Sequence, residues 1–123
     1  MEIPVSQTAN RTLTASLEPV VVIDNPGYSG SILRVDLENK GASAVTGWKL
    51  YAKATPTAPL RDITPGSVTA ADGYLVVTPA PRAPTLAAAA NTQLAINCTL
   101  WHRMELHFAG AGAQLAASWE VMS

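Results

Sequence analysis

The stretch that decides the fold is Arg103–Met122, RMELHFA-GAGA-QLAASWEVM, in which two alternating segments flank a glycine-containing turn. The apolar residues of each segment share one parity: Met104, Leu106 and Phe108 before the turn, and Leu115, Ala117, Trp119 and Val121 after it. An apolar residue at every second position is typical of a β-strand with one buried side and one side in water. The stretch therefore predicts a β-hairpin between residues 103–109 and 114–122, and with it an antiparallel β fold.

The same alternation predicts strands upstream. Residues 31–39 place Asp36 and Glu38 on their polar side, and residues 47–54 place Lys49 and Lys53 there. The Asn-Lys-Gly turn between these segments predicts a second hairpin, in which the opposite charges would face each other across the pair. Further short strands are expected at 12–17, 20–23, 73–78 and 93–99.

About seven to eight such strands, with turn signals between them, are typical of a β-sandwich. The sequence therefore predicts an all-β fold, namely an antiparallel two-sheet β-sandwich that is jelly-roll-like. The side chains on the apolar parity of the strands form the predicted core, which comprises Leu33, Val35, Leu37, Trp48, Leu50, Leu106, Phe108, Leu115 and Trp119.

The length of 123 residues argues for a single sandwich domain, expected over residues 12–123. Residues 1–11 are expected to form an extended N-terminal arm, because they are polar apart from Ile3 and Val5 on either side of Pro4. These two side chains would fit apolar pockets of a neighbouring subunit while the arm adds to a sheet edge. A disordered terminus is the alternative.

Charge and composition exclude some classes of partner. The eight Lys and Arg residues are scattered singly and the net charge is −1, so the basic stripe typical of nucleic-acid binding is missing. No apolar run approaches the roughly 18 residues of a membrane-spanning helix. The lone Cys98 precludes an intrachain disulfide and fits assembly in a reducing cytoplasm.

Only 14% of the residues are charged. A surface with so little charge suits coverage by neighbouring subunits and predicts a homo-oligomer, for which a trimer is one option. The alternative is that Ser, Thr and Asn supply the polarity of a small monomer.

The patterns that catalysis or cofactor binding require are missing from the sequence. His102 and His107 are five residues apart, so they have opposite parity on a strand and do not chelate a metal together. The turn Gly27–Gly30 contains a serine but lacks the Gly-x-Ser-x-Gly spacing of a nucleophile turn. Asp36 and Glu38 belong to a charge-balanced, solvated face rather than to a pair of catalytic acids. We therefore expect no enzyme, and no catalytic residue, metal or cofactor.

The three tryptophans separate into two groups. Trp48 and Trp119 share the parity of the predicted core, whereas Trp101 lies beside His102 at the entrance to a strand. Trp101 and His102 therefore join Ile3 and Val5 as candidate interface residues. The alternative is that the three tryptophans form a platform on which sugar rings stack.

Residues 33–50, LRVDLENKGASAVTGWKL, resemble the strand–turn–strand of bacterial cellulose-binding β-sandwich modules, where an Asn-x-Gly turn is followed by Gly-Trp. Those modules usually carry a cysteine pair and a row of exposed tryptophans in later strands, and this chain has neither pattern. The resemblance implies a carbohydrate-binding module.

A second resemblance spans residues 31–123. A central Leu-Arg-Val-x-Leu-x-Asn strand, a Trp-Lys-Leu strand, a proline-rich loop, the run Thr85–Ala89 and the closing Ser-Trp-Glu-Val strand follow one another. This layout is similar to that of small β-sandwich structural proteins of tailed bacteriophages, among them decoration and minor head proteins.

The second resemblance implies a non-enzymatic virion structural protein, most simply a capsid decoration or minor head protein. Such a protein binds the major capsid protein or another virion protein, binds neither nucleic acid nor membrane, and is found in the virion after assembly in the host cytoplasm. A carbohydrate-binding module remains the alternative function.

Overall fold

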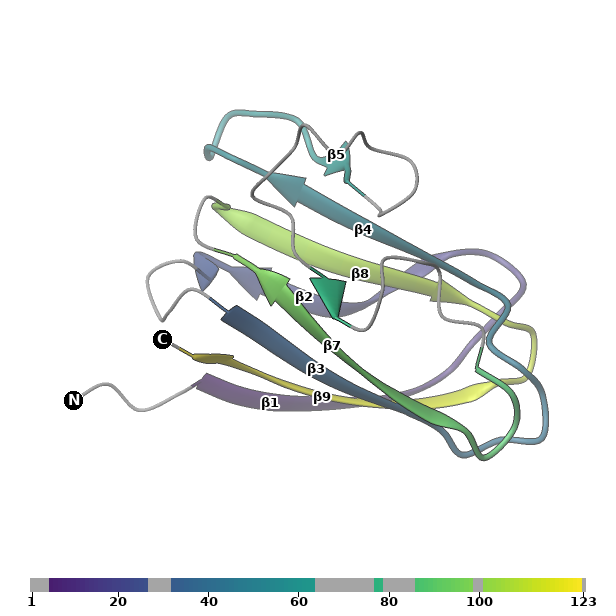
Figure 1. Ribbon diagram of the computed structural model, residues 1–123. Helices are drawn as coiled ribbons and strands as arrows, with labels where there is room; N and C mark the ends of the chain where they lie inside the picture. Colours follow the sequence, from purple (N-terminus) through teal and green to yellow (C-terminus); the bar gives the residue numbers. More distant parts are fainter. Residues whose placement is uncertain (1–4, 27–31, 64–76, 79–85, 99–100, 123) are drawn as a thin grey trace.

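The computed structural model describes residues 5–26, 32–63, 77–78, 86–98 and 101–122, which form two antiparallel sheets packed face to face (Figure 1). Within these residues the first sheet has the strand order β1-β9-β3-β7-β6 and the second has the order β2-β8-β4-β5. The strands are β1 Val5–Thr12, β2 Glu18–Asp24, β3 Ile32–Asn39, β4 Gly47–Lys53, β5 Arg61–Asp62, β6 Val77–Thr78, β7 Asn91–Asn97, β8 Arg103–Ala109 and β9 Gln114–Met122.

The strand pairing is that of a jelly roll. The early strands pair with the late ones in reverse order, because β1 pairs with β9, β2 with β8, β3 with β7 and β4 with β5. The chain therefore folds as one long hairpin that is wrapped into two sheets, and the short β6 adds to the edge beside β7. The predicted all-β, two-sheet sandwich is confirmed.

The predicted closing hairpin is wrong, although both of its strands have the predicted bounds. β8 pairs with β2 and β4 in one sheet, and β9 pairs with β1 and β3 in the other. The turn between them crosses from sheet to sheet and packs against the 44–45 segment. A Cβ added to Gly110 would lie 2.5 Å from the Ala44 carbonyl oxygen and 2.9 Å from the Val45 Cα, so only glycine fits this crossing.

The predicted hairpin between residues 31–39 and 47–54 is also wrong. β3 pairs with β7 and β9, while β4 lies in the opposite sheet. Lys49 and Lys53 therefore do not face Asp36 and Glu38. Lys49 Nζ instead lies 2.8 Å from Oδ2 of Asp62, a residue of the neighbouring strand β5.

The expected arm is corrected by the structure, because its described part is a strand of the sandwich. β1 pairs with β9 along its whole length, from Val5 opposite Val121 to Thr12 opposite Gln114. Of the expected strand at 12–17, Thr12 is the last residue of β1 and residues 13–17 connect β1 to β2. The polar composition of β1 has a physical reason: a strand at the edge of a sheet has solvent on one side as well as on its outer face.

The predicted core is confirmed, because all nine expected residues are buried between the sheets. Trp48 stacks on Phe108 with 6.4 Å between the ring centroids. A bulge in β2 between Pro19 and Val21 brings two successive valines, Val20 and Val21, into the interior. Of the remaining expected strands, 20–23 and 93–99 correspond to β2 and β7, and only the last two residues of 73–78 are described, as β6.

Candidate functional site

A row of charged side chains crosses the outer face of the second sheet at its central strand. β8 alternates between buried apolar residues and the outward-facing Arg103, Glu105 and His107. β2 and β4 pair with β8 on its two sides, so the strand that carries the row is held in place by both neighbours. We call Arg103, Glu105 and His107 the β8 row.

The β8 row and its neighbours form a continuous chain of polar contacts. The Arg103 guanidinium donates from Nη1 to Asp24 Oδ1 at 2.6 Å and from Nε to Glu105 Oε2 at 2.7 Å. Glu105 Oε1 lies 2.8 Å from His107 Nε2. The imidazole in turn lies against the Tyr51 ring, with the centroids 4.6 Å apart. One carboxylate is therefore held between a guanidinium and an imidazole.

Glu105 is the most enclosed member of the β8 row, with 12% of its side chain exposed. Burial by itself would raise its pKa, but the hydrogen bonds with His107 and Arg103 outweigh burial, so the pKa of Glu105 lies below its usual value. The same contacts raise the pKa of Arg103, first through Glu105 and then through Asp24. Glu105 and Arg103 are therefore both charged at neutral pH.

We expect the loss of stability in acid to run partly through Glu105. A carboxyl with a depressed folded pKa stabilises the fold above its ordinary value of 4.5, and this stabilisation is lost as the pH falls through the folded pKa. Glu105→Gln should lower the free energy of unfolding at pH 7 by about 1–2 kcal/mol and flatten its decline between about pH 5 and pH 3. Denaturant unfolding across that range measures both effects. Glu38→Gln, on the exposed face of the other sheet, is the control, and an unchanged pH slope in Glu105→Gln would refute the assignment.

The β8 row shares one contact with hydrolytic sites, and the neighbours of its imidazole can be compared with those of a triad. A carboxylate that orients an imidazole is also part of hydrolytic triads, but a triad needs a hydroxyl or thiol beyond the imidazole. The cross-strand neighbours of His107 are Pro19 and Lys49. The row places charges of both signs on the outer face of the second sheet.

The β8 row was not predicted as a unit. From the sequence, His107 was considered only as a metal ligand, and the polar parity of residues 103–109 was interpreted as the side of the strand in water. The available signal was Arg-x-Glu-x-His on one parity, which places three complementary side chains in line on one strand. Without the partners of β8, the contributions of Asp24 and Tyr51 could not be found.

The structure fixes two of the candidate interface residues in the connection from β7 to β8. Trp101 is partly buried against the core, and its amide donates to the Cys98 carbonyl at 3.2 Å. The His102 amide donates to the Lys53 carbonyl at 2.8 Å, and the His102 carbonyl accepts from the Asn25 amide at 2.6 Å. Their part in an interface stays a prediction.

The other two candidates belong to the N-terminal segment. Val5 is the first residue of β1, in the opposite sheet from β8, and Ile3 lies outside the described residues. The tryptophans do not form an exposed row, because Trp48 and Trp119 are buried on strands of opposite sheets. Their predicted place in the core is confirmed.

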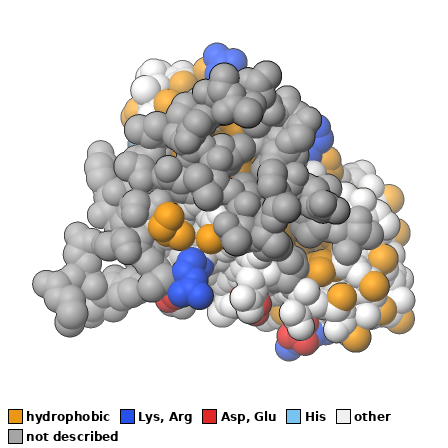
Figure 2. Space-filling view, in the orientation of Figure 1, with side chains coloured by type: hydrophobic (Ala, Val, Ile, Leu, Met, Phe, Trp, Pro, Cys, Tyr) orange, Lys and Arg blue, Asp and Glu red, His pale blue; other side chains and the backbone are white. Residues whose placement is uncertain are grey.

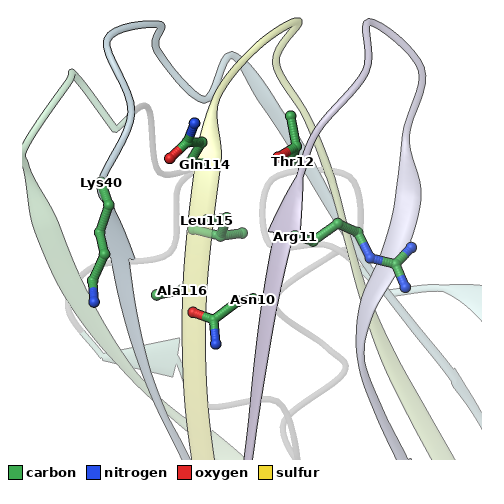
Figure 3. A pocket seen from close by; sticks show the side chains of 7 residues that line it. All are labelled: Asn10, Arg11, Thr12, Lys40, Gln114, Leu115 and Ala116. Atoms are coloured by element: carbon green, nitrogen blue, oxygen red, sulfur yellow. The ribbon is translucent and has the colours of Figure 1, made fainter.

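A shallow hollow of about 180 Å³ lies on the first sheet where β9 begins (Figure 3). Lys40 and Arg11 lie on opposite sides of β9 there, and the Arg11 side chain points away from the other labelled residues. Asn10 and Gln114 supply amides to the lining. The two cations are therefore not brought together on one ligand position.

The charges visible on one face of the molecule are dispersed. In Figure 2 the described Lys and Arg side chains lie apart from one another. Within the described residues, no cluster of three or more His, Cys, Asp or Glu side chains could hold a metal ion. The described part of the chain also contains no helix of the length and apolarity needed to cross a membrane.

Comparison with known proteins gives a likeness of fold. The crystal structure of the SPBc2 prophage-derived protein YomS superimposes on this chain with a TM-score of 0.56, covering 98% of this chain and 96% of that chain at 8% sequence identity. No family model matches the sequence. No curated protein matches it either.

Proposed function

We propose that this chain is a non-enzymatic structural protein of a bacteriophage or prophage particle, and specifically a capsid decoration or minor head protein. It acts by binding the major capsid protein or another virion protein, so it resides in the virion after assembly in the host cytoplasm. The observation that carries the proposal is the likeness, over nearly the whole of both chains, to a prophage-derived protein.

The architecture supports this proposal. Jelly rolls recur in viral capsid domains, where two wrapped sheets leave outer faces and loops for contacts with other subunits. Here the interior is filled by apolar side chains, so binding to a partner would use the surface. The fixed charges of the β8 row give such a partner a defined pattern to match.

The first test is the presence of the chain in particles. In density-purified particles from the phage or induced lysogen that encodes it, mass spectrometry should find the chain at a fixed ratio to the major capsid protein. A soluble host protein of similar abundance in the lysate serves as the contamination control. A chain that is abundant in the lysate but depleted from particles to the level of this control would overturn the proposal.

The N-terminal segment has its own test, in which the bounds of β1 decide how many residues to remove. Removing residues 1–10 would strip most of β1 from β9, so loss of binding would report on folding. Removing residues 1–4 leaves β1 whole and still removes Ile3. We expect the shorter deletion to keep the thermal midpoint and to weaken attachment to particles. Unchanged attachment would exclude a role for Ile3.

Carbohydrate binding is the competing function, and Trp101 is the tryptophan on which it would depend, because Trp48 and Trp119 are buried. If the virion proposal is right, neither the unmodified chain nor Trp101→Ala should bind polysaccharides above background. Binding by the unmodified chain that is lost in Trp101→Ala would favour the module instead.

A further inference from the structure

The edges of the two sheets differ in how they are protected against pairing with another strand. β5 and β6 are two residues long. β2 carries Pro19, a bulge, and an acidic residue at each end. Short strands, proline, bulges and charge are the devices that block edge pairing. Three of the four sheet edges in the described chain are therefore protected.

β1 is the exception. It is eight residues long, contains no proline, runs in unbroken register with β9, and carries a single charge at Arg11. That charge is engaged within the chain, because Arg11 Nη1 lies 3.4 Å from Glu18 Oε1. Residues 7, 8 and 10–12 of the strand are exposed. No described strand flanks β1 on the side away from β9.

The backbone groups on that free side can be identified from hydrogen bonds near the end of β9. The Leu13 amide donates to Ala113, and the Lys40 amide donates to Gln114, each at 2.8 Å. Paired residues of an antiparallel ladder alternate between bonded and non-bonded. Odd-numbered residues of β9 therefore bond to β1, and even-numbered ones bond to β3.

The odd-numbered residues of β1 are consequently those that bond to β9. The even-numbered residues, Ser6, Thr8, Asn10 and Thr12, direct their amides and carbonyls to the free edge. A partner strand must meet these residues to form a regular ladder.

We propose that β1 is a self-association edge, which pairs antiparallel with β1 of a second copy of this chain about a two-fold axis. The register that uses all four outward residues places Thr8 opposite Asn10 and Ser6 opposite Thr12 of the second copy. Ala9 then lies on the axis in a non-bonded pair, where the strands approach most closely and a small side chain fits. The two first sheets become one continuous sheet joined by about eight main-chain hydrogen bonds.

The second copy is favoured as the occupant by self-complementarity. A two-fold contact requires one patch to match itself, and a nearly uncharged edge does so without repulsion. In this register the two Arg11 residues lie near opposite ends of the paired segment, each opposite Gln7 of the other copy. Pairing of two β1 strands does not require a virion, so its test is independent of the virion proposal.

The test compares two lysine substitutions that differ in their distance from the edge. Thr8 and Ser118 are neighbours across the β1–β9 ladder and share the outer face, but only Thr8 lies at the edge. We expect the unmodified chain and Ser118→Lys to form dimers with rising concentration in sedimentation equilibrium, and Thr8→Lys to stay monomeric. A strict monomer at high micromolar concentration, a trimer, or equal dimerisation of the two variants would overturn the proposal.

Hydrogen exchange provides a readout that a merely destabilising substitution would not imitate. In the unmodified chain, the amides of Thr8 and Asn10 should become more protected as concentration rises, whereas those of Gln7 and Ala9 should be protected throughout because they bond to β9. Asn10→Pro removes an outward amide without removing a bond to β9, so it should abolish the dimer and keep the protection of Gln7. Exchange at Thr8 and Asn10 that is independent of concentration would refute the pairing.

Discussion

Asn39→Asp should lower the free energy of unfolding at pH 7 by about 4 kcal/mol. This loss is larger than the loss of about 3 kcal/mol that we expect for Asn39→Ala. The substitution changes one NH₂ group to an oxygen and leaves the shape of the side chain intact. Its large expected effect follows from what the Asn39 amide contacts, because the side chain is fully buried.

Asn39 joins three segments of the chain through its side chain. Nδ2 donates to the Ser43 carbonyl at 2.7 Å and to the Leu86 and Ala87 carbonyls at 3.2 and 3.3 Å. Oδ1 accepts from the amides of Gly41 and Gln114 at 3.0 and 3.3 Å. The amide thus fixes the crossing from β3 to β4, the turn before β7 and the start of β9. A carboxylate there would face three carbonyl oxygens without a proton to donate.

The pH dependence separates this cause from a loss of packing. A buried carboxyl surrounded by carbonyls has a raised pKa, so it destabilises the fold above that pKa and does so less as the pH falls. The deficit of Asn39→Asp relative to the unmodified chain should therefore shrink from pH 7 to about pH 4 in denaturant unfolding. Asn91→Asp makes the same change at an exposed position and should be near neutral. A deficit in Asn39→Asp that is constant with pH would rule out the carbonyl contacts as its cause.

For β3, β4, β8 and β9, alternation along the chain predicted which residues are strands and which side of each strand is buried. The bounds of β8 and β9 and the whole predicted core follow from parity alone, because a strand with one buried side must place apolar residues at every second position. Parity does not show which strands pair with one another. β8 and β9 bury their apolar sides into the same interior from opposite sheets, and a tight hairpin would give the same sequence pattern.

The features that decide between these two arrangements are long-range. The local sequence predicts that Asn39 is a turn residue, yet two of its side-chain hydrogen bonds reach the segment at 86–87. The local sequence predicts that Gly110 is part of a hairpin turn. Glycine is required there because the backbone at 44–45 approaches too closely for a side chain. The β8 row was missed for the same reason, because Asp24 lies 79 residues from Arg103 in the sequence.

Trp119→Ala should lower the free energy of unfolding by about 3–5 kcal/mol, which is a large part of the stability of a small domain. Trp119 lies in the middle of β9, with β1 and β3 on either side, and 7% of it is exposed. Its removal would leave a cavity between the sheets that neighbouring strands, held in their ladders, cannot close. The thermal midpoint should fall by more than 10 °C, because 1 kcal/mol corresponds to about 4 °C for a domain of this size.

Trp119→Phe distinguishes loss of packing from loss of a polar contact. The Trp119 Nε1 is buried and has no hydrogen-bond partner among the described residues, so Phe keeps much of the apolar volume and removes an N–H that is costly to bury. We expect Trp119→Phe to cost about 1 kcal/mol or less. Glu120→Ala, one residue along β9 on the outer face, should stay within about 0.5 kcal/mol of the unmodified chain. An unchanged midpoint in Trp119→Ala, or equal losses in the Phe and Ala variants, would show that this side chain does not stabilise the interior through its packed volume.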